Sequence, residues 1–159
     1  LGDVYKRQGR FTCLSESPLF FVDGAHNEDA ALKLKVTVER YFSDYKKIFI
    51  MGVFKDKEYE KIVQILCPSA KRVYTVDLPN KERTLPAEKL AECVRDCMTE
   101  QLSVYAEKSI GDAVAKAYTY ATEDSGKRAV IACGSLSYLS EVIRCMEGCV
   151  QNPQRKERI

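Results

Sequence analysis

The sequence predicts an α/β fold built on a mostly parallel, twisted sheet of five to six strands with helices on both faces. Short apolar runs alternate with stretches of helical periodicity five times along the 159 residues. This β-α order is typical of a parallel sheet. The run at residues 19–22 is continuously apolar, as in a strand that is covered on both faces. Because the connections are short, right-handed crossovers should join the strands.

The first half of the chain contains three of the expected strands. Residues 11–14 could form a short edge strand before the buried strand at residues 19–22. Residues 28–42 then carry apolar side chains at helical spacing. A further strand at residues 47–51 precedes a helix at residues 59–66, which a proline two positions later should close.

The second half continues the same alternation. Pro86 is suited to the first position of a helix, because its fixed φ matches the helical value. Ser109 with Asp112 resembles a capping pair that opens a helix extending to residue 121. A last helix should include residues 139–146. The strands expected in this half are residues 72–76, 103–106 and 129–133.

The composition indicates one globular domain. Hydrophobic residues make up 45% and charged residues 30%, and no segment approaches the roughly 20 apolar residues of a membrane helix. The net charge of +2 is a small difference between 25 basic and 23 acidic residues, which does not favour nucleic-acid binding. Seven cysteines without a Cys-x-x-Cys pair, together with one histidine, match no zinc spacing. We therefore expect reduced thiols and a cytoplasmic location.

The two ends of the sequence differ from the rest. Residues 1–8 show no periodicity and look like a remnant of cloning or sequencing. Residues 9–147 should form the domain. Residues 148–159 are polar and charged, and we expect a frayed tail.

The turn after the buried strand holds the strongest candidate site. Asp23, Gly24, His26 and Asn27 place a carboxylate, an imidazole and an amide directly before a helix. In open α/β sheets, ligands bind beyond the carboxyl ends of the strands, where such turns lie. The alternative is structural: Asp23 and Asn27 would only cap the helix, and His26 would be a surface residue.

Two further loops reach the same sheet edge. Ser135, after Gly134, could bind a carboxylate or phosphate, or it could be an ordinary helix cap. The Gly-x-Ser-x-Gly frame of serine hydrolases is missing. Lys55 and Asp56 lie in a polar loop that is either a ligand contact or a solvated turn. Glycine-rich phosphate-binding motifs are missing, so another segment would have to hold most of an ATP molecule.

Three motifs together resemble one enzyme family. Residues 23–27 (Asp-Gly-Ala-His-Asn), residues 51–57 and residues 133–136 are similar, in order and separation, to the carboxyl-terminal domain of folylpolyglutamate synthase and the bifunctional dihydrofolate synthase. Residues 9–11 resemble the lead-in of that domain, so the resemblance covers about residues 9–147. It implies one Rossmann-like α/β domain.

The resemblance also implies an activity. Members are ATP-dependent amide ligases related to the muramyl peptide ligases: ATP phosphorylates a folate carboxylate, and the amine of L-glutamate attacks the acyl phosphate. In the family, an amino-terminal domain carries the P-loop, the Mg²⁺ ligands and most of the folate site. We therefore expect ATP and Mg²⁺ to be bound mainly by a domain that this sequence lacks, with no metal ligand here. The chain alone should be inactive.

The resemblance also implies roles for particular residues. It implies catalytic roles for Asp23 and His26, and nucleotide contacts for Asp23, Asn27 and Lys55. Glu28 departs from the proline that often follows the asparagine in the family, which should alter only the first helical turn.

For the folate and glutamate substrates, the resemblance implies contacts with His26, Ser135 and Asp56. We expect a monomer that binds folate and L-glutamate and neither nucleic acid nor membrane. Two alternatives stay open: a muramyl-type ligase domain, and a stand-alone nucleotide- or metabolite-binding module without catalysis.

Overall fold

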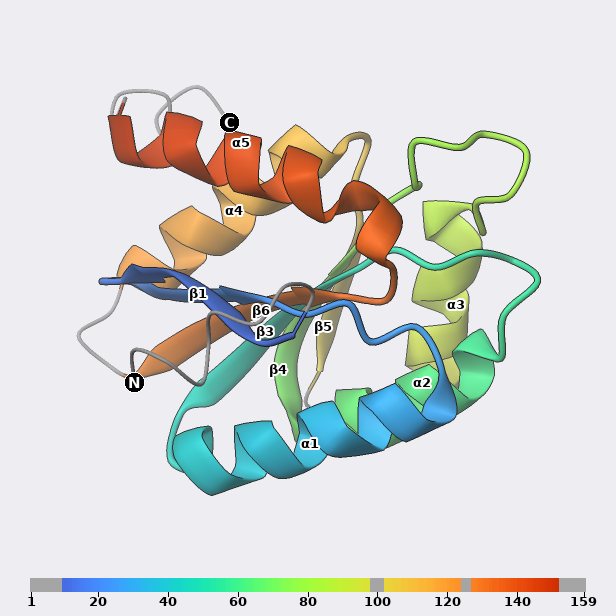
Figure 1. Cartoon of the computed structure of the whole chain (residues 1–159), viewed down its shortest axis with the longest axis horizontal. Helices are drawn as coiled ribbons and strands as arrows, with labels where there is room; N and C mark the ends of the chain where they lie inside the picture. Colours follow the sequence, from blue (N-terminus) through green and yellow to red (C-terminus); the bar gives the residue numbers. More distant parts are fainter. Residues whose placement is uncertain (1–9, 98–101, 124–126, 152–159) are drawn as a thin grey trace.

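The computed structural model describes residues 10–97, 102–123 and 127–151. They form one six-stranded sheet in the order β1-β2-β6-β3-β4-β5 (Figure 1). β1 runs antiparallel to β2, and the remaining neighbours are parallel. The strands are β1 (Thr12–Glu16), β2 (Leu19–Val22), β3 (Lys46–Met51), β4 (Ala70–Thr75), β5 (Ser103–Ala106) and β6 (Arg128–Cys133). The predicted α/β fold with a mostly parallel sheet is confirmed.

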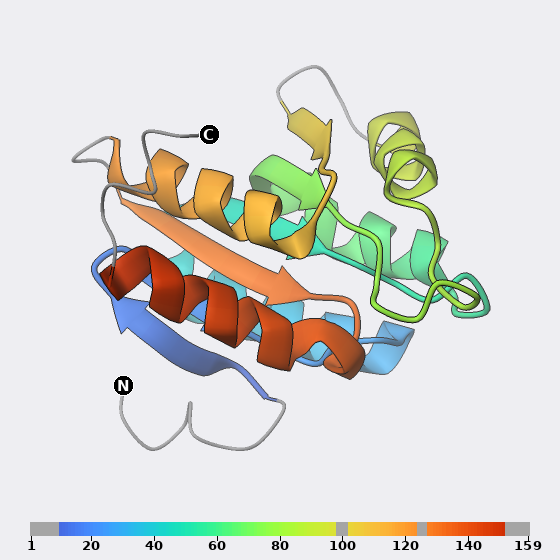
Figure 2. The same cartoon turned by 90° about the horizontal axis from the view of Figure 1, so that it is seen from above.

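Among the described residues, five α-helices cover the two faces of the sheet (Figures 1 and 2). α1, α2 and α3 pack on one face, and α4 and α5 pack on the other. Single 3₁₀ turns follow α2 (η1, Cys67–Ser69) and precede α5 (η2, Leu136–Tyr138). The helices are α1 (Glu28–Phe42), α2 (Tyr59–Leu66), α3 (Ala87–Cys97), α4 (Ile110–Thr122) and α5 (Leu139–Gln151). None in the described part of the chain is long and apolar enough to cross a membrane.

The central strand β3 shows why the strands are continuously apolar. Successive side chains of a strand point to opposite faces. Phe49 and Met51 therefore pack against the α1–α3 layer, while Ile48 and Ile50 pack against the α4–α5 layer. All four are buried. Both layers exclude water, and each buried side chain of this size contributes about 1.5–3 kcal/mol.

Local sequence signals agree closely with the observed element bounds. Asn27 caps α1, and Ser109 caps α4 by accepting a hydrogen bond from the backbone N–H of Asp112. The structure differs at the carboxyl end, because α5 continues to Gln151 past the expected start of the tail at residue 148. Cys149 is buried against the core, so this last turn has an apolar face to cover.

The order of the strands fixes where a site can form. The chain leaves β2 and β3 toward helices on one face, and it leaves β6, which lies between them, toward a helix on the other face. Helices diverge in this way at the switch point of an open α/β sheet, and a crevice opens beyond the strand ends. Figure 1 shows the loops after β2, β3, β4 and β6 at this common edge.

Candidate functional site

The turn after β2 and the turn after β6 are hydrogen-bonded to each other. The backbone N–H of Asp23 donates to the carbonyl of Ala132 at 2.9 Å. The N–H of Gly134 donates back to the carbonyl of Ala25, also at 2.9 Å. These two bonds extend the pairing of β2 with β6 beyond the strands. The structure thus brings residues 23–27 and Ser135 onto adjoining turns.

Asp23 anchors its own turn through both carboxylate oxygens. Oδ1 accepts from the N–H of Ala25 and Oδ2 accepts from the N–H of Phe11, each at 2.8 Å. The pKa of the Asp23 carboxyl is raised, because the effect of burial exceeds the lowering effects of the two hydrogen bonds and of the nearby Arg10. Asp23 therefore does not cap α1. It ties the start of β1 to the turn that carries His26.

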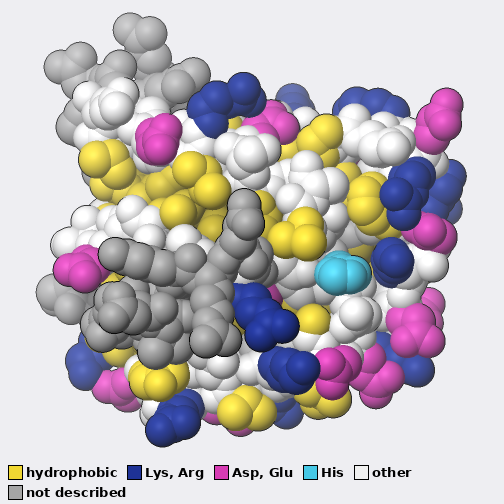
Figure 3. All heavy atoms as spheres, in the orientation of Figure 1, with side chains coloured by type: hydrophobic (Ala, Val, Ile, Leu, Met, Phe, Trp, Pro, Cys, Tyr) yellow, Lys and Arg dark blue, Asp and Glu magenta, His cyan; other side chains and the backbone are white. Residues whose placement is uncertain are grey.

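The ring of His26 has a defined orientation. Its Nδ1 lies 2.9 Å from the carbonyl oxygen of Gly24. A carbonyl can only accept, so the tautomer that makes this hydrogen bond carries its hydrogen on Nδ1 and has a lone pair on Nε2. The side chain is half-buried, and Figure 3 shows it at the surface near lysine or arginine side chains. The imidazole can thus accept a proton or a hydrogen bond from a ligand.

Asn27 has the structural role that the sequence offered as an alternative. Its Oδ1 accepts from the backbone N–H of Ala30 at 2.8 Å, and its backbone is extended, as in a helix N-cap. Glu28 follows as the first residue of α1 and pairs with Lys61 on α2 at 3.4 Å. Glutamate in the first turn is favourable for a helix, so the missing proline leaves the helix intact.

Gly134 lets the ends of β6 and β3 approach closely. Its φ is +107°, and a Cβ atom here would lie 2.3 Å from the carbonyl oxygen of Gly52. Ser135, which is 2% exposed, then accepts from the N–H of Ser137 at 3.1 Å and lies 2.8 Å from its hydroxyl. It caps the 3₁₀ turn η2, which is the cap alternative of the sequence. The backbones after β6 and β3 are therefore in close contact at this point.

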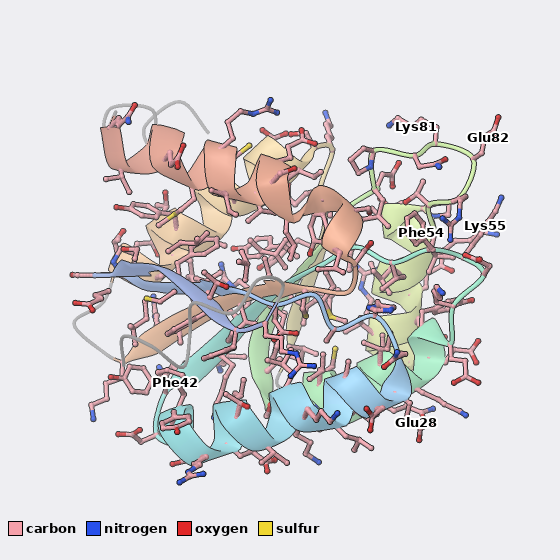
Figure 4. The ribbon with its side chains drawn as sticks, in the orientation of Figure 1. Glu28, Phe42, Phe54, Lys55, Lys81 and Glu82 are labelled. Atoms are coloured by element: carbon pink, nitrogen blue, oxygen red, sulfur yellow. The ribbon has the colours of Figure 1, made fainter. Side chains whose placement is uncertain are left out.

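Lys55 and Asp56 lie at the outer end of the same edge. The N–H of Lys55 donates to the carbonyl of Arg83 at 2.9 Å, and Asp56 pairs with the Arg83 guanidinium at 3.4 Å. In Figure 4 Lys55 points outward on the side of the loop that carries Lys81 and Glu82. Lys55 and Asp56 therefore lie in the loop after β3, where they contact Arg83 of the loop after β4, and not in the turn that carries His26.

Arg83 was not among the residues that the sequence motifs singled out. Its guanidinium lies over the ring of Phe54, 3.9 Å from the centroid, and it holds Asp56 as well. Residues 77–83 are mostly polar in the sequence, but the pairing of this arginine with the loop after β3 depends on the order of the strands in the sheet. A bridge between Phe54 and Thr84 joins the two loops.

The residues present do not form a complete site for ATP or Mg²⁺. Across the described ranges, no cluster of three or more histidine, cysteine, aspartate or glutamate side chains could hold a metal ion. The sequence also contains no Gly-x-x-x-x-Gly-Lys-Ser/Thr loop for phosphates. The described residues therefore supply neither a metal cluster nor a phosphate-binding loop of this kind.

Comparison with known proteins decides the family. The sequence pattern of the family described as "Mur ligase, glutamate ligase domain" matches residues 9–136. The chain belongs to this family. Folylpolyglutamate synthase of Lacticaseibacillus casei is 34% identical over 77 residues, which are 48% of this chain and 18% of that protein. Matches to four curated synthases of this kind cover only 14% to 18% of their lengths.

Solved structures show the same fold. E. coli FolC in complex with DHPP and ADP superposes with a TM-score of 0.76 at 23% identity, over 89% of this chain and 32% of FolC. The bifunctional folylpolyglutamate synthase/dihydrofolate synthase from Yersinia pestis, complexed with AMPPNP and Mn ion, gives 0.72 at 24% identity, over 89% and 32%. The chain thus spans about a third of the length of these two structures.

Proposed function

We propose that this chain is the carboxyl-terminal, glutamate-side domain of an ATP-dependent ligase that adds L-glutamate to folate. The observation that carries the proposal is the pair of hydrogen-bonded turns, in which the turn that carries His26 adjoins the turn that carries Ser135. Family membership supports the reaction class. The names of the relatives, folylpolyglutamate and dihydrofolate synthases, support folate as the acceptor.

Activity in this proposal requires a second domain. The chain corresponds to about a third of the solved FolC-type structures it resembles. It lacks a phosphate-binding loop of its own. We propose that an amino-terminal domain with a P-loop holds ATP and Mg²⁺, and that residues 23–27 face the nucleotide from the opposite wall. Lys55 and Asp56 would lie near that interdomain cleft.

The residues of this chain have distinct proposed tasks. His26 would accept a proton from the ammonium group of incoming glutamate at Nε2, because Nδ1–H is held by Gly24. Asp23 would position this turn, since both its oxygens already bind backbone N–H groups. Asn27 would present its amide to the nucleotide while it caps α1, and Ser135 would help hold the glutamate.

An activity assay tests the proposal. The gene is expressed together with its upstream coding sequence, and ADP release from ATP is measured with folate and L-glutamate. We expect release that requires both substrates, and none from the 159-residue chain alone. Release that depends on a muramyl-type acceptor instead of folate would contradict the folate assignment. Measurable turnover by the isolated chain would contradict the need for a second domain.

A binding measurement separates the stand-alone module from the ligase domain. Calorimetry of the isolated chain with ATP should show weak or no binding, because the phosphate groups have few partners here. Tight nucleotide binding by the chain alone would favour the module. We also propose a cytoplasmic monomer. The seven cysteines, all in the described part of the chain, are thiols, which supports a reducing compartment.

A further inference from the structure

A hollow beside the edge strand β5 lies outside the site described above. It has a volume of about 360 Å³ and sits between β4, β5 and the carboxyl-terminal half of α4. Pockets that bind small molecules usually have volumes of about 300–1,000 Å³. Its walls include three tyrosines and four charged residues: Tyr74, Tyr105, Tyr120, Arg72, Lys116, Glu107 and Glu123.

The tyrosines offer an aromatic surface. Tyr74 and Tyr105 are paired across β4 and β5, with ring centroids 5.5 Å apart and planes within 25°. Tyr74 is almost fully covered, whereas Tyr105 is 42% exposed. α4 packs on β3, β4 and β6, and α3 packs on β5 from the other face, so the ring of Tyr105 is left accessible. A flat ring could stack on it.

Arg72 supplies an unneutralised positive charge at the same place. Its guanidinium lies 3.5 Å from the ring centroid of Tyr120 and 5.3 Å from that of Tyr105. Nη1 donates to the hydroxyl of Tyr74 at 3.1 Å, and Nε is buried without a hydrogen-bond partner. Within residues 10–97, 102–123 and 127–151 no carboxylate pairs with Arg72. A guanidinium has five donors, so it can still bind an anion.

The other charged side chains of the hollow leave Arg72 without a carboxylate partner among the described residues. Glu107, whose side chain is only 6% exposed, is already paired with Lys116 at 2.7 Å. Glu123 also lines the hollow, and no ion pair joins it to Arg72 in the described part of the chain. The hollow therefore combines a stacking surface with one guanidinium that no described carboxylate pairs.

We propose that this hollow binds a small aromatic anion, a flat ring carrying one carboxylate or phosphate group. The ring stacks on Tyr105, and the anionic group accepts hydrogen bonds from Arg72. The proposal is independent of the ligase function, because the hollow lies on the β5 side of the sheet and is tested without nucleotide or glutamate.

The test is a set of titrations of the isotope-labelled 159-residue chain followed by NMR. The probes are 2-naphthoate, phenyl phosphate, inorganic phosphate and the neutral 2-naphthamide. We expect 2-naphthoate or phenyl phosphate to shift the resonances of Tyr105 and Arg72. The tighter-binding of these two ring anions should have a Kd at least about tenfold below that of inorganic phosphate and at least about tenfold below that of the amide. The reason is that a charge-assisted hydrogen bond and a stacked ring each add about tenfold in affinity. The tighter of the two ring anions identifies the anionic group.

Variants separate the proposed site from general surface binding. Arg72→Gln and Tyr105→Ala should each weaken the tighter probe about tenfold or more. Lys71→Gln is the matched control for charge, because Lys71 is exposed on the same strand and points to the other face. Tyr41→Ala is the control for ring loss, since Tyr41 on α1 is 43% exposed. Both controls should leave the Kd unchanged.

Three results would overturn the proposal. The first is that neither ring-bearing anion binds the folded wild-type chain. The second is that inorganic phosphate binds as tightly as the ring-bearing anions, which would leave no role for stacking. The third is that Arg72→Gln and Tyr105→Ala behave like their controls. The comparison of the probes uses the wild-type chain only, so it tests the proposal even if a variant fails to fold.

Discussion

Replacing Gly134 by alanine should strongly destabilise this domain, because two backbone segments meet at that glycine. The residue has a φ of +107°, a region that side chains of L-amino acids rarely adopt. Its missing Cβ would lie 2.3 Å from the carbonyl oxygen of Gly52 and 3.1 Å from a methyl group of Val53. Neither the backbone oxygen nor the strand end behind it can move aside without disturbing β3.

Three contributions set the magnitude. Forcing a non-glycine residue into this backbone region costs about 1–2 kcal/mol. Overpacking against a backbone atom costs about 1–3 kcal/mol more. The hydrogen bond from Gly134 to Ala25 at 2.9 Å would weaken as the turn moved, for about 1 kcal/mol. We therefore expect a loss of roughly 3–6 kcal/mol, or about 6–24 °C in Tm for a domain of this size.

Urea denaturation of the 159-residue chain measures the effect, with Gly111→Ala as the matched control. Gly111 lies in the first turn of α4, and the nearest atoms to its added Cβ are 3.8 Å away. That change should range from neutral to a gain of about 1 kcal/mol, because alanine favours the helix. If Gly134→Ala and Gly111→Ala agree within about 0.5 kcal/mol, the close approach of β6 to β3 is refuted.

Three further changes test other parts of the structure. Asn27→Ala should lower the free energy of unfolding by about 1 kcal/mol through loss of the helix cap, measured by thermal denaturation; an unchanged Tm would contradict capping. Burial raises the pKa of Asp23, so the folded state binds its proton more tightly, and this contribution to stability is lost as pH rises through the raised pKa. In urea titrations across pH, the free energy of unfolding of the wild type minus that of Asp23→Asn should therefore fall as pH rises. A difference that grows with pH would contradict the raised pKa. Lys116→Met leaves Glu107 buried without its ion-pair partner and should lower the free energy of unfolding by about 1–2 kcal/mol. The control Lys33→Met removes an exposed pair and should lower it by under about 0.5 kcal/mol. Equal losses in urea denaturation would contradict the burial of the Glu107–Lys116 pair.

Local patterns predicted most of the fold. The helix at residues 28–42 and the strands at residues 19–22 and 103–106 have the bounds that the sequence indicated. Their signals, apolar periodicity and turn residues, are contained within each segment. The end of α5 was not predictable in this way. Gly148 is typical of a helix end, yet packing of Cys149 on the core carries the helix onward.

The candidate site was predictable as a set of residue types, and less so as a set of contacts. An acid, an imidazole and a serine at strand ends were readable from the sequence. That Asp23 binds the N–H of Phe11, twelve residues away, depends on the antiparallel pairing of β1 with β2. The approach of Gly134 to Gly52 likewise depends on β6 lying beside β3, which no local pattern encodes.

The most direct test of the central claim is the kinetics of glutamate addition by the complete ligase carrying His26→Ala. The account predicts that kcat/KM for L-glutamate falls at least about tenfold while Tm changes little, because the ring contributes a proton acceptor rather than packing. Asp29→Ala, an exposed change in the first turn of α1, should leave kcat/KM unaltered. If His26→Ala matches Asp29→Ala in kcat/KM, the turn after β2 does not take part in glutamate use and the account is contradicted.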